Sequence, residues 1–338
     1  MIMTKQYQKM VFRSKEKRHH IKLIKNKFFG NDKGYGYFGK DKKRYSFVLE
    51  DGVNNLYEPI RNEVLKYFEE NVIEWWGDNP DYPTGHTVSS QIACLNHLMF
   101  LRQKPTEVLS LINGLGQIEF TKVLPVPCDA DISYIAFEVI SDNSYLNEPE
   151  HIRGSYCTSI DALIYAEDIN NKKWIIPIEW KYTEAYGDSS EDDKSLEDYK
   201  WRKGEHGKGK ERMRRYNGLI TKSQQLKSLK NYESSAYYFE PFYQLMRQTL
   251  WAEQMIKNKA TERIKADHYL HIHVIPKNNV DLLQKTYKFS NQNMEVTWRS
   301  MLNEQSKYII IDPQELISPI KSRFPELYNY LKTRYYGE

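Results

Sequence analysis

The stretch that decides the fold is SIDALIYAEDINNKKWIIPIEWKY, residues 159–182. Two runs rich in apolar and β-branched residues, 159–167 and 174–182, flank the polar segment 168–173. Apolar runs joined by a short polar turn are typical of a β-hairpin. The sequence therefore predicts two neighbouring antiparallel strands here, and this is the clearest β signal in the chain.

Three charged side chains interrupt the hairpin: Asp161, Glu179 and Lys181. Because side chains alternate across a strand, Glu179 and Lys181 share one face and Trp180 points to the other. A turn centred on Asn170 places Asp161 opposite Glu179 on that same face. A turn centred between residues 170 and 171 would not place Asp161 opposite Glu179, so the prediction depends on the register.

The rest of the chain supplies elements around this hairpin. Helical periodicity predicts helices over 57–76, 88–103 and 238–256, with Ser89 or Ser90 as the cap of the second and Pro105 ending or restarting it. Further strands are predicted over 120–126, 132–140, 267–276 and 308–311. This order indicates an α/β fold with additions at both ends.

Charge is unevenly distributed, although the net charge is only +4. Residues 1–44 hold fourteen Lys or Arg against three Asp or Glu, and 201–215 hold seven against two. Residues 188–198 are acidic, with six acids and one lysine. Clustered basic charge favours a polyanionic partner, because each neutralised phosphate releases counterions. A solvated tail, and a loop whose two halves attract each other, are the alternative interpretations.

Other features exclude some classes of protein. Cys94, Cys128 and Cys157 form no CxxC pair, so neither a disulfide framework nor a structural zinc site is expected. The sequence contains no apolar run long enough for a transmembrane helix and no P-loop. The N-terminal region is basic and lacks the apolar stretch of a secretory signal. We therefore expect a cytoplasmic protein with reduced thiols and no membrane partner.

The charged face of the hairpin suggests metal chemistry. Two carboxylates held together repel each other unless a cation neutralises them, and Lys181 offsets only one charge. Mg²⁺, held by one oxygen from each acid and by a backbone carbonyl, would neutralise the remaining negative charge. It would also make a bound water molecule more acidic. By spacing alone, an exposed polar sheet face is the commoner interpretation of these residues.

Asp161 followed by Glu179-Trp180-Lys181 at the end of the next apolar strand resembles the PD-(D/E)xK nuclease superfamily. The phrases SSQIACLN (89–96), TSIDALIYAE (158–167), IPIEWKYTEAYG (176–187) and PFYQLMRQTLWAEQ (241–254) resemble a bacterial family of restriction-endonuclease-like proteins. The departure is Ile160, which stands where the superfamily often has proline.

The resemblance implies a restriction-endonuclease-like core, a mixed β-sheet flanked by helices, over 57–280. This core would contain a charged flexible loop at 187–215. A basic arm (1–56) would precede this core and an α/β addition (281–338) would follow it. Asp161 and Glu179 would be metal ligands together with the Trp180 carbonyl, Lys181 would be the catalytic lysine, and Mg²⁺ would be the cofactor, with Mn²⁺ as a substitute. Gln244 would face the site from the following helix, with Arg247 or Gln248 beside it; a surface glutamine on an amphipathic helix is the alternative interpretation.

Several residues have weaker claims on the site. Glu138, Glu148 and Glu184 are candidates for a further ligand, although an ordinary surface glutamate is the commoner interpretation of each. His271 and His273 alternate on a strand, and we expect a half-buried strand edge rather than a metal pair. The proposed contacts to a nucleic-acid backbone, from a mobile glycine-containing loop, are Lys208, Lys210, Arg212, Arg214 and Arg215.

These features together predict a metal-dependent nuclease that acts on DNA. One alternative is a nucleic-acid-binding protein of nuclease fold that no longer cuts. The other is a phosphoesterase acting on a different substrate. Double-strand cutting would suggest a homodimer.

Overall fold

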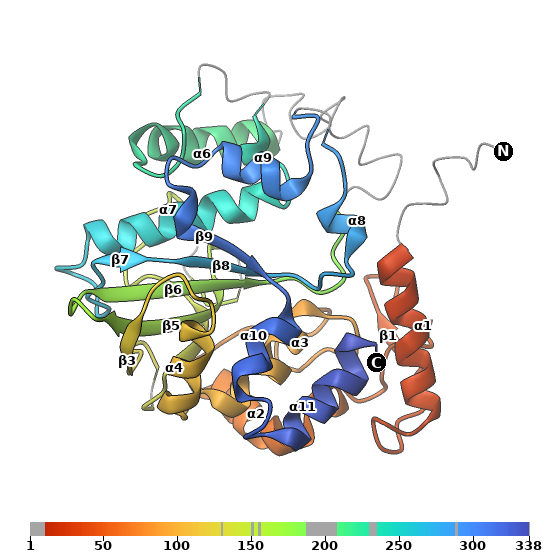
Figure 1. Cartoon of the computed structure of the whole chain (residues 1–338). Coiled ribbons are helices and arrows are strands. Elements are labelled where there is room, and N and C mark those ends of the chain that lie inside the picture. Colours follow the sequence, from red (N-terminus) through yellow and green to blue (C-terminus); the bar gives the residue numbers. More distant parts are fainter. Residues whose placement is uncertain are drawn as a thin grey trace.

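The computed structural model describes residues 11–129, 131–149, 152–154, 157–186, 208–229, 235–287 and 290–337. Its central feature is a seven-stranded mixed sheet, with helices packed on both faces (Figure 1). This arrangement confirms the predicted α/β class and is consistent with a restriction-endonuclease-like core.

The sheet is built around the predicted hairpin. Its strands are β3 (Phe120–Leu124), β4 (Ile135–Val139), β5 (Ile160–Asp168), β6 (Lys173–Trp180), β7 (His268–Tyr269), β8 (His271–Val274) and β9 (Tyr308–Ile311). β5 pairs antiparallel with β6 on one edge and with β3 and β4 in succession on the other. Beyond β6 the pairing is parallel, first to β7 and β8 and then from β8 to β9. The strand expected in the C-terminal addition therefore extends the central sheet.

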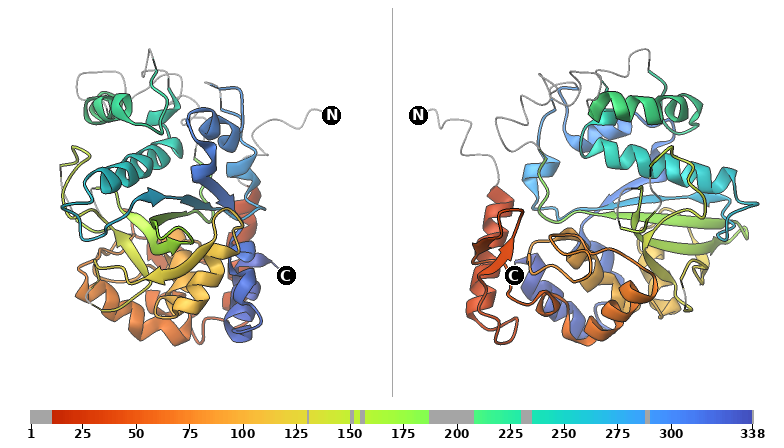
Figure 2. Two further views of the ribbon diagram at one scale, coloured as in Figure 1. Left: turned by 60° about the vertical axis from the view of Figure 1, so that its left-hand side comes forward. Right: turned by 180° about the vertical axis from the view of Figure 1, so that it is seen from behind.

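Helices cover both faces of the sheet (Figure 2). One face carries α6 (Lys208–Lys222), α7 (Phe242–Lys257) and α9 (Met294–Ser300). The other carries α2 (Arg61–Glu70), α3 (Ser90–Leu98), α4 (Pro105–Asn113), α10 (Pro313–Ile317) and α11 (Pro325–Leu331). α1 (Val11–Lys25) and α8 (Val280–Leu283) lie to one side, near the small ribbon of β1 (Gly36–Phe38) and β2 (Lys43–Tyr45). Short 3₁₀ turns occupy Gly52–Asn55, Glu58–Ile60, Met99–Leu101, Ala236–Tyr238, Gln305–Lys307 and Ser318–Ile320, and a π-helical turn occupies Lys332–Tyr336.

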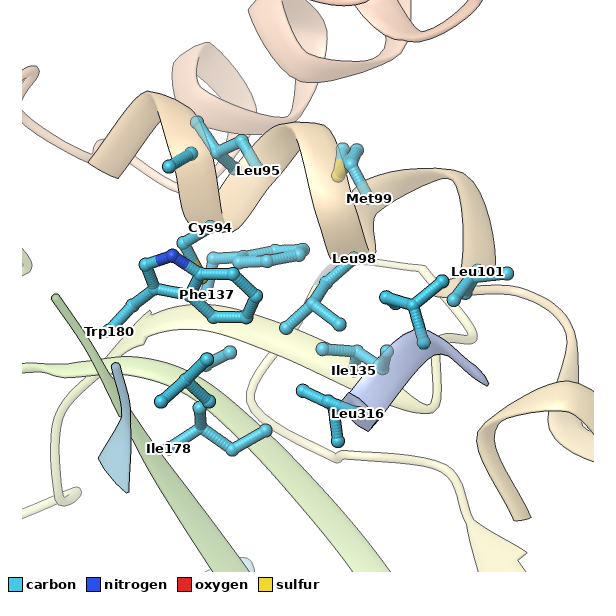
Figure 3. Close-up of a cluster of buried hydrophobic side chains, with 14 of the residues drawn as sticks. Cys94, Leu95, Leu98, Met99, Leu101, Ile135, Phe137, Ile178, Trp180 and Leu316 are labelled. Carbon is cyan, nitrogen blue, oxygen red and sulfur yellow. The ribbon is translucent and has the colours of Figure 1, made fainter. Parts of the chain in front are cut away.

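Apolar side chains form a separate core on each face of the sheet. In the core under α3, every side chain from Ile92 to Leu98 is buried (Figure 3). Ile178 and Trp180 point into this core, as their alternation with Glu179 predicts. Burying one large apolar side chain contributes about 1.5–3 kcal/mol, so this packing fixes the end of β6 firmly.

The N-terminal region differs from the loosely packed arm that its sequence indicates. Val11–Lys25 form α1, whose buried residues include Phe12, Glu16 and His20. A hydrophobic pattern does not detect this helix, because two positions of its buried stripe are polar. The first backbone N–H groups of α1 donate to the carboxylate of Asp281, with Phe12 N at 2.8 Å from Oδ2. A side chain from α8 therefore caps the helix.

One predicted helix ends earlier than expected, while the predicted cap at Ser89 and the predicted restart at Pro105 are confirmed. The helix expected over 57–76 is preceded by a 3₁₀ turn and ends at Glu70, because Val72 adopts a φ of +52° and is exposed. α3 is capped by Ser89, whose Oγ accepts from Ile92 N at 3.4 Å, and Pro105 starts a new helix rather than continuing it. In the described part of the chain, no helix is both long and apolar enough to cross a bilayer.

Candidate active site

The hairpin register brings the two predicted acids together. Ala162 lies opposite Ile178, which centres the turn where the pairing requires. Asp161 and Glu179 each lie one position beyond this pair, and their charges interact. The backbone N–H of Trp180 donates to Asp161 Oδ2 at 2.6 Å, which orients the aspartate at the junction of the two strands.

Glu179 and Lys181 lie on the side of the sheet covered by α7. Their exposed fractions are 2% and 4%, so both charges are almost fully removed from water. Lys181 Nζ forms an ion pair with Glu179 Oε1, and Gln248 of α7 donates to the other oxygen, Oε2. The backbone N–H of Lys181 donates to the Val274 carbonyl at 2.9 Å, which ties the residue to the neighbouring β8.

Glu138 supplies a third carboxylate at this point. It lies between the residues of β4 that pair with β5, directly beside Asp161, and its φ of +50° is rare for a residue with a side chain. Gln91 Nε2 and Ser159 Oγ each donate to its carboxylate at 2.9 Å. The interpretation of Glu138 as an ordinary surface glutamate is wrong, since its side chain is buried in the site. Its position inside an apolar strand was the signal that could have identified it.

The charges of this cluster do not balance. Burial, followed by repulsion from Glu179 and Glu138, raises the pKa of Asp161 well above its ordinary value. Burial is also the main cause of the raised pKa of Glu138. Burial alone would lower the pKa of Lys181, but the combined charges of the groups around it, with Glu179 foremost, outweigh burial and raise the pKa well above its ordinary value. Three carboxyl groups therefore share one ammonium, and ionising all three of them costs free energy.

A cavity of about 440 Å³ opens onto these residues. It is bounded on one side by α7 and on the other by residues from α1, from the segment before α3, and from α3 itself. The lining residues are Arg13, Trp76, His86, Val88, Ser89, Ser90, Gln91, Glu138, Gly154, Cys157, Ser159, Asp161, Glu179, Lys181, Thr183, Glu184, Tyr186, Gln244 and Arg247. The charged cluster is therefore accessible to a ligand of moderate size.

The α7 wall contains the predicted glutamine and arginine. Gln244 lines the cavity, and its Oε1 accepts a hydrogen bond from Tyr186 at 2.9 Å. Arg247 also lines the cavity, with Nη1 3.5 Å from Glu148 Oε1. Glu148 accepts a hydrogen bond from the backbone N–H of Thr158 at 2.7 Å. It does not line the cavity, so its role is to hold Arg247 in position.

Glu184 adds a further carboxylate to the cavity lining, alongside the thiol of Cys157. Glu184 lines the cavity, and its Oε2 accepts from Tyr182 N at 2.7 Å. Burial, and then the charge of Glu148, raise the pKa of the Cys157 thiol to about 11, so this sulfur stays protonated at neutral pH. In the described residues no three His, Cys, Asp or Glu side chains already surround one point. The carboxylate of Glu179 is bonded to Lys181 and Gln248.

The two strand histidines are fully buried, contrary to the half-buried strand edge that we expected. β8 lies between β6 and β9, so it is not an edge strand. His271 Nε2 is 2.7 Å from Gln248 Oε1, and Gln248 in turn donates to Glu179. His273 Nδ1 is 2.8 Å from the Tyr308 hydroxyl. His271 therefore orients Gln248, one helical turn beyond the predicted Gln244.

The basic cluster predicted on a mobile loop lies instead on α6, while residues 187–207 fall outside the described residues. The backbone of Lys208 is helical, and the side chain of Lys210 is exposed. Arg214 and Arg215 both pair with Glu211 within the helix. Arg212 turns inward, donating to the Tyr238 carbonyl at 2.7 Å and lying 3.7 Å from the Tyr243 ring centroid. Arg212 is therefore engaged in packing, which the loop interpretation did not foresee.

The chain is similar to a known protein family. No curated protein and no solved structure matches the chain. A family model described as "Restriction Endonuclease associating with ARP" matches residues 18–336, which is nearly the whole sequence. The matched region includes Glu138, Asp161, Glu179 and Lys181. The chain therefore belongs to this restriction-endonuclease-like family.

Proposed function

We propose that the protein is a metal-dependent nuclease that hydrolyses DNA phosphodiester bonds. The observation that supports this most strongly is the excess of buried carboxylates over ammonium groups in an open cavity. Family membership is consistent with a nuclease-like function. The PD-(D/E)xK assignment of Asp161, Glu179 and Lys181 is part of the proposal.

The residues in the cavity suit a hard divalent cation. Asp161 and Glu179, on neighbouring strands, line the same cavity, and Glu138 adds a third carboxylate beside Asp161. Asp161 and Glu179, with the Trp180 carbonyl, would hold Mg²⁺ or Mn²⁺, because both ions prefer oxygen ligands. A bound ion would supply polarisation of the phosphate and a more acidic water.

The remaining cavity residues would act on the substrate. Lys181 would stabilise the negative charge that develops on the phosphate during attack, since its ammonium is buried and so is little screened by water. Arg247 and Gln244 would bind phosphate oxygens from the α7 wall. The basic N-terminal region and the exposed Lys210 of α6 would attract the DNA backbone.

The test is plasmid cleavage by purified protein in Mg²⁺ or Mn²⁺, compared with the Asp161→Asn and Lys181→Ala variants. Lys122→Ala is a matched control, because Lys122 lies on β3 of the same sheet but pairs with Glu167 at the surface. We expect cleavage by the wild type and the control, and losses of at least about 100-fold in the other two variants.

Equal cutting by wild type and both site variants would indicate contamination and remove the proposal. Two further measurements separate the alternatives. Calorimetry that shows no uptake of divalent ions would favour a silent binding protein. Hydrolysis of small phosphate esters without cleavage of DNA would select a phosphoesterase.

A further inference from the structure

The wall of the cavity opposite α7 combines an exposed aromatic ring with a cation that the proposed reaction does not use. Trp76 lines this wall, and 49% of the residue is exposed. Its ring centroid lies 5.5 Å from that of Phe38 and 5.7 Å from that of His86. The indole is thus supported from within the protein and still accessible at the cavity.

The position of Trp76 is fixed relative to the carboxylate cluster. Its backbone N–H donates to Gln91 Oε1 at 3.0 Å, and the amide of the same Gln91 donates to Glu138 at 2.9 Å. Gly77 then turns the chain with a φ of +134°, a conformation that side chains rarely permit. One side chain therefore links the aromatic ring to the proposed reaction centre.

Arg13 supplies the positive charge of this wall. It comes from the first turn of α1, before the region that the family model matches. Its Nε is buried and has no hydrogen-bond partner in the described part of the chain. Burial, followed by the nearby charges of Lys17 and Arg13, lowers the pKa of His86 to about 3, so His86 is neutral at physiological pH. A ligand anion on this wall would therefore meet Arg13.

We infer that this wall is a subsite for an unpaired nucleotide, with the base stacked on Trp76 and an adjacent phosphate bound by Arg13. The inference rests on the proposed function and narrows its substrate to DNA with an unstacked base beside the scissile phosphate, such as a single-stranded end or flap. Bases within an intact duplex are already stacked and do not offer a face to an aromatic side chain.

Binding is measured by fluorescence anisotropy in EDTA, with a labelled single-stranded oligonucleotide and with a blunt duplex. We expect Trp76→Ala to weaken single-strand binding about tenfold and to leave duplex binding unchanged, while Trp76→Phe keeps most of the affinity. Arg13→Ala should also weaken single-strand binding and should reduce its salt dependence. Tyr37→Ala is the control, because Tyr37 is 58% exposed but does not line the cavity.

A strand with one abasic position sharpens the test. Wild type should lose affinity for the abasic strand when the missing base is the stacked one, and Trp76→Ala should lose little more. Equal losses on single strand and duplex, or no loss in Trp76→Ala, would overturn the subsite. Because these measurements need no cleavage, an inactive protein that still shows them would refute the nuclease proposal and leave the subsite standing.

Discussion

Two clusters of buried polar side chains meet at the end of β6, and they differ in charge balance and in access. The carboxylate cluster consists of Glu138, Asp161, Glu179 and Lys181 and opens onto the cavity. The second, which we name the terminal network, consists of Glu16, His20, Asn55, Tyr182 and Arg334. The consecutive residues Lys181 and Tyr182 belong one to each, so the two clusters share a backbone but have different surroundings.

The terminal network joins both ends of the chain to the sheet. Arg334 donates to the Asn55 carbonyl and to the Tyr330 hydroxyl, each at 2.6 Å, and also to the Asn55 side chain. His20 Nε2 lies 3.0 Å from the Tyr182 hydroxyl, which donates to Glu16 at 2.6 Å.

This network has one carboxyl group and one guanidinium, and its members bond to one another. The carboxylate cluster has three acids to one ammonium. Burial of polar groups alone therefore does not indicate a functional site. Buried charges that do not balance, beside an open cavity, do indicate one.

Arg334→Ala should give the largest effect, by breaking the terminal network. Removing the guanidinium leaves several buried acceptors without donors, so we expect a loss of about 3–5 kcal/mol in the free energy of unfolding. Arg323→Ala is the matched control, because its side chain is 41% exposed and pairs with Glu107 at the surface. The control should lose no more than about 1 kcal/mol. Urea unfolding measures both, and equal losses would contradict a structural role for the network.

Acid should weaken the terminal network through His20. Burial lowers the folded-state pKa of His20 well below its ordinary value of 6.5. Below pH 6.5, His20 therefore binds a proton in the unfolded state but stays neutral in the folded state. Stability is therefore full above pH 6.5 and falls as the pH drops below it, by up to about 1.4 kcal/mol per pH unit for each such histidine. Urea unfolding at pH 7 and pH 5 should show a smaller fall in His20→Gln than in wild type. An unchanged fall would show that His20 is protonated without cost.

In the carboxylate cluster, Asp161→Asn should stabilise the protein at pH 7 in EDTA, by about 1 kcal/mol. The folded-state pKa of Asp161 is raised, so its destabilisation appears as the pH rises through that pKa, and asparagine removes the ionisable group. The amide oxygen can still accept from Trp180 N. Added Mg²⁺ should raise the melting temperature of wild type but not of this variant. A destabilised variant would place Asp161 among balanced structural groups.

The exposed charges of α6 should give the smallest effect. Arg214→Ala should change stability by at most about 0.5 kcal/mol, because its ion pair with Glu211 is solvated. DNA affinity should fall less than about threefold, since Glu211 already offsets part of its charge. Lys210→Ala provides the comparison on the same helix. A tenfold loss of DNA binding in Arg214→Ala would show that α6 makes specific contacts.

Some residues of this site can be predicted from the sequence and others cannot, for physical reasons. The facing of Asp161 and Glu179 was predictable, because a short turn sets the register of a hairpin locally. Glu138 and Gln248 were harder to place, since their positions depend on elements distant in sequence. The buried stripe of α1 includes Glu16 and His20, which no hydrophobic pattern detects. The neighbouring glycines led to the prediction of a mobile loop around Arg212, which in fact lies on α6.

The most direct test of the central claim is anomalous diffraction from a crystal of the protein soaked in Mn²⁺. The unbalanced carboxylate cluster predicts a peak in coordination contact with both Asp161 and Glu179, and no peak there in an Asp161→Asn crystal. A fully loaded wild-type crystal that shows no manganese between these two side chains would contradict the account.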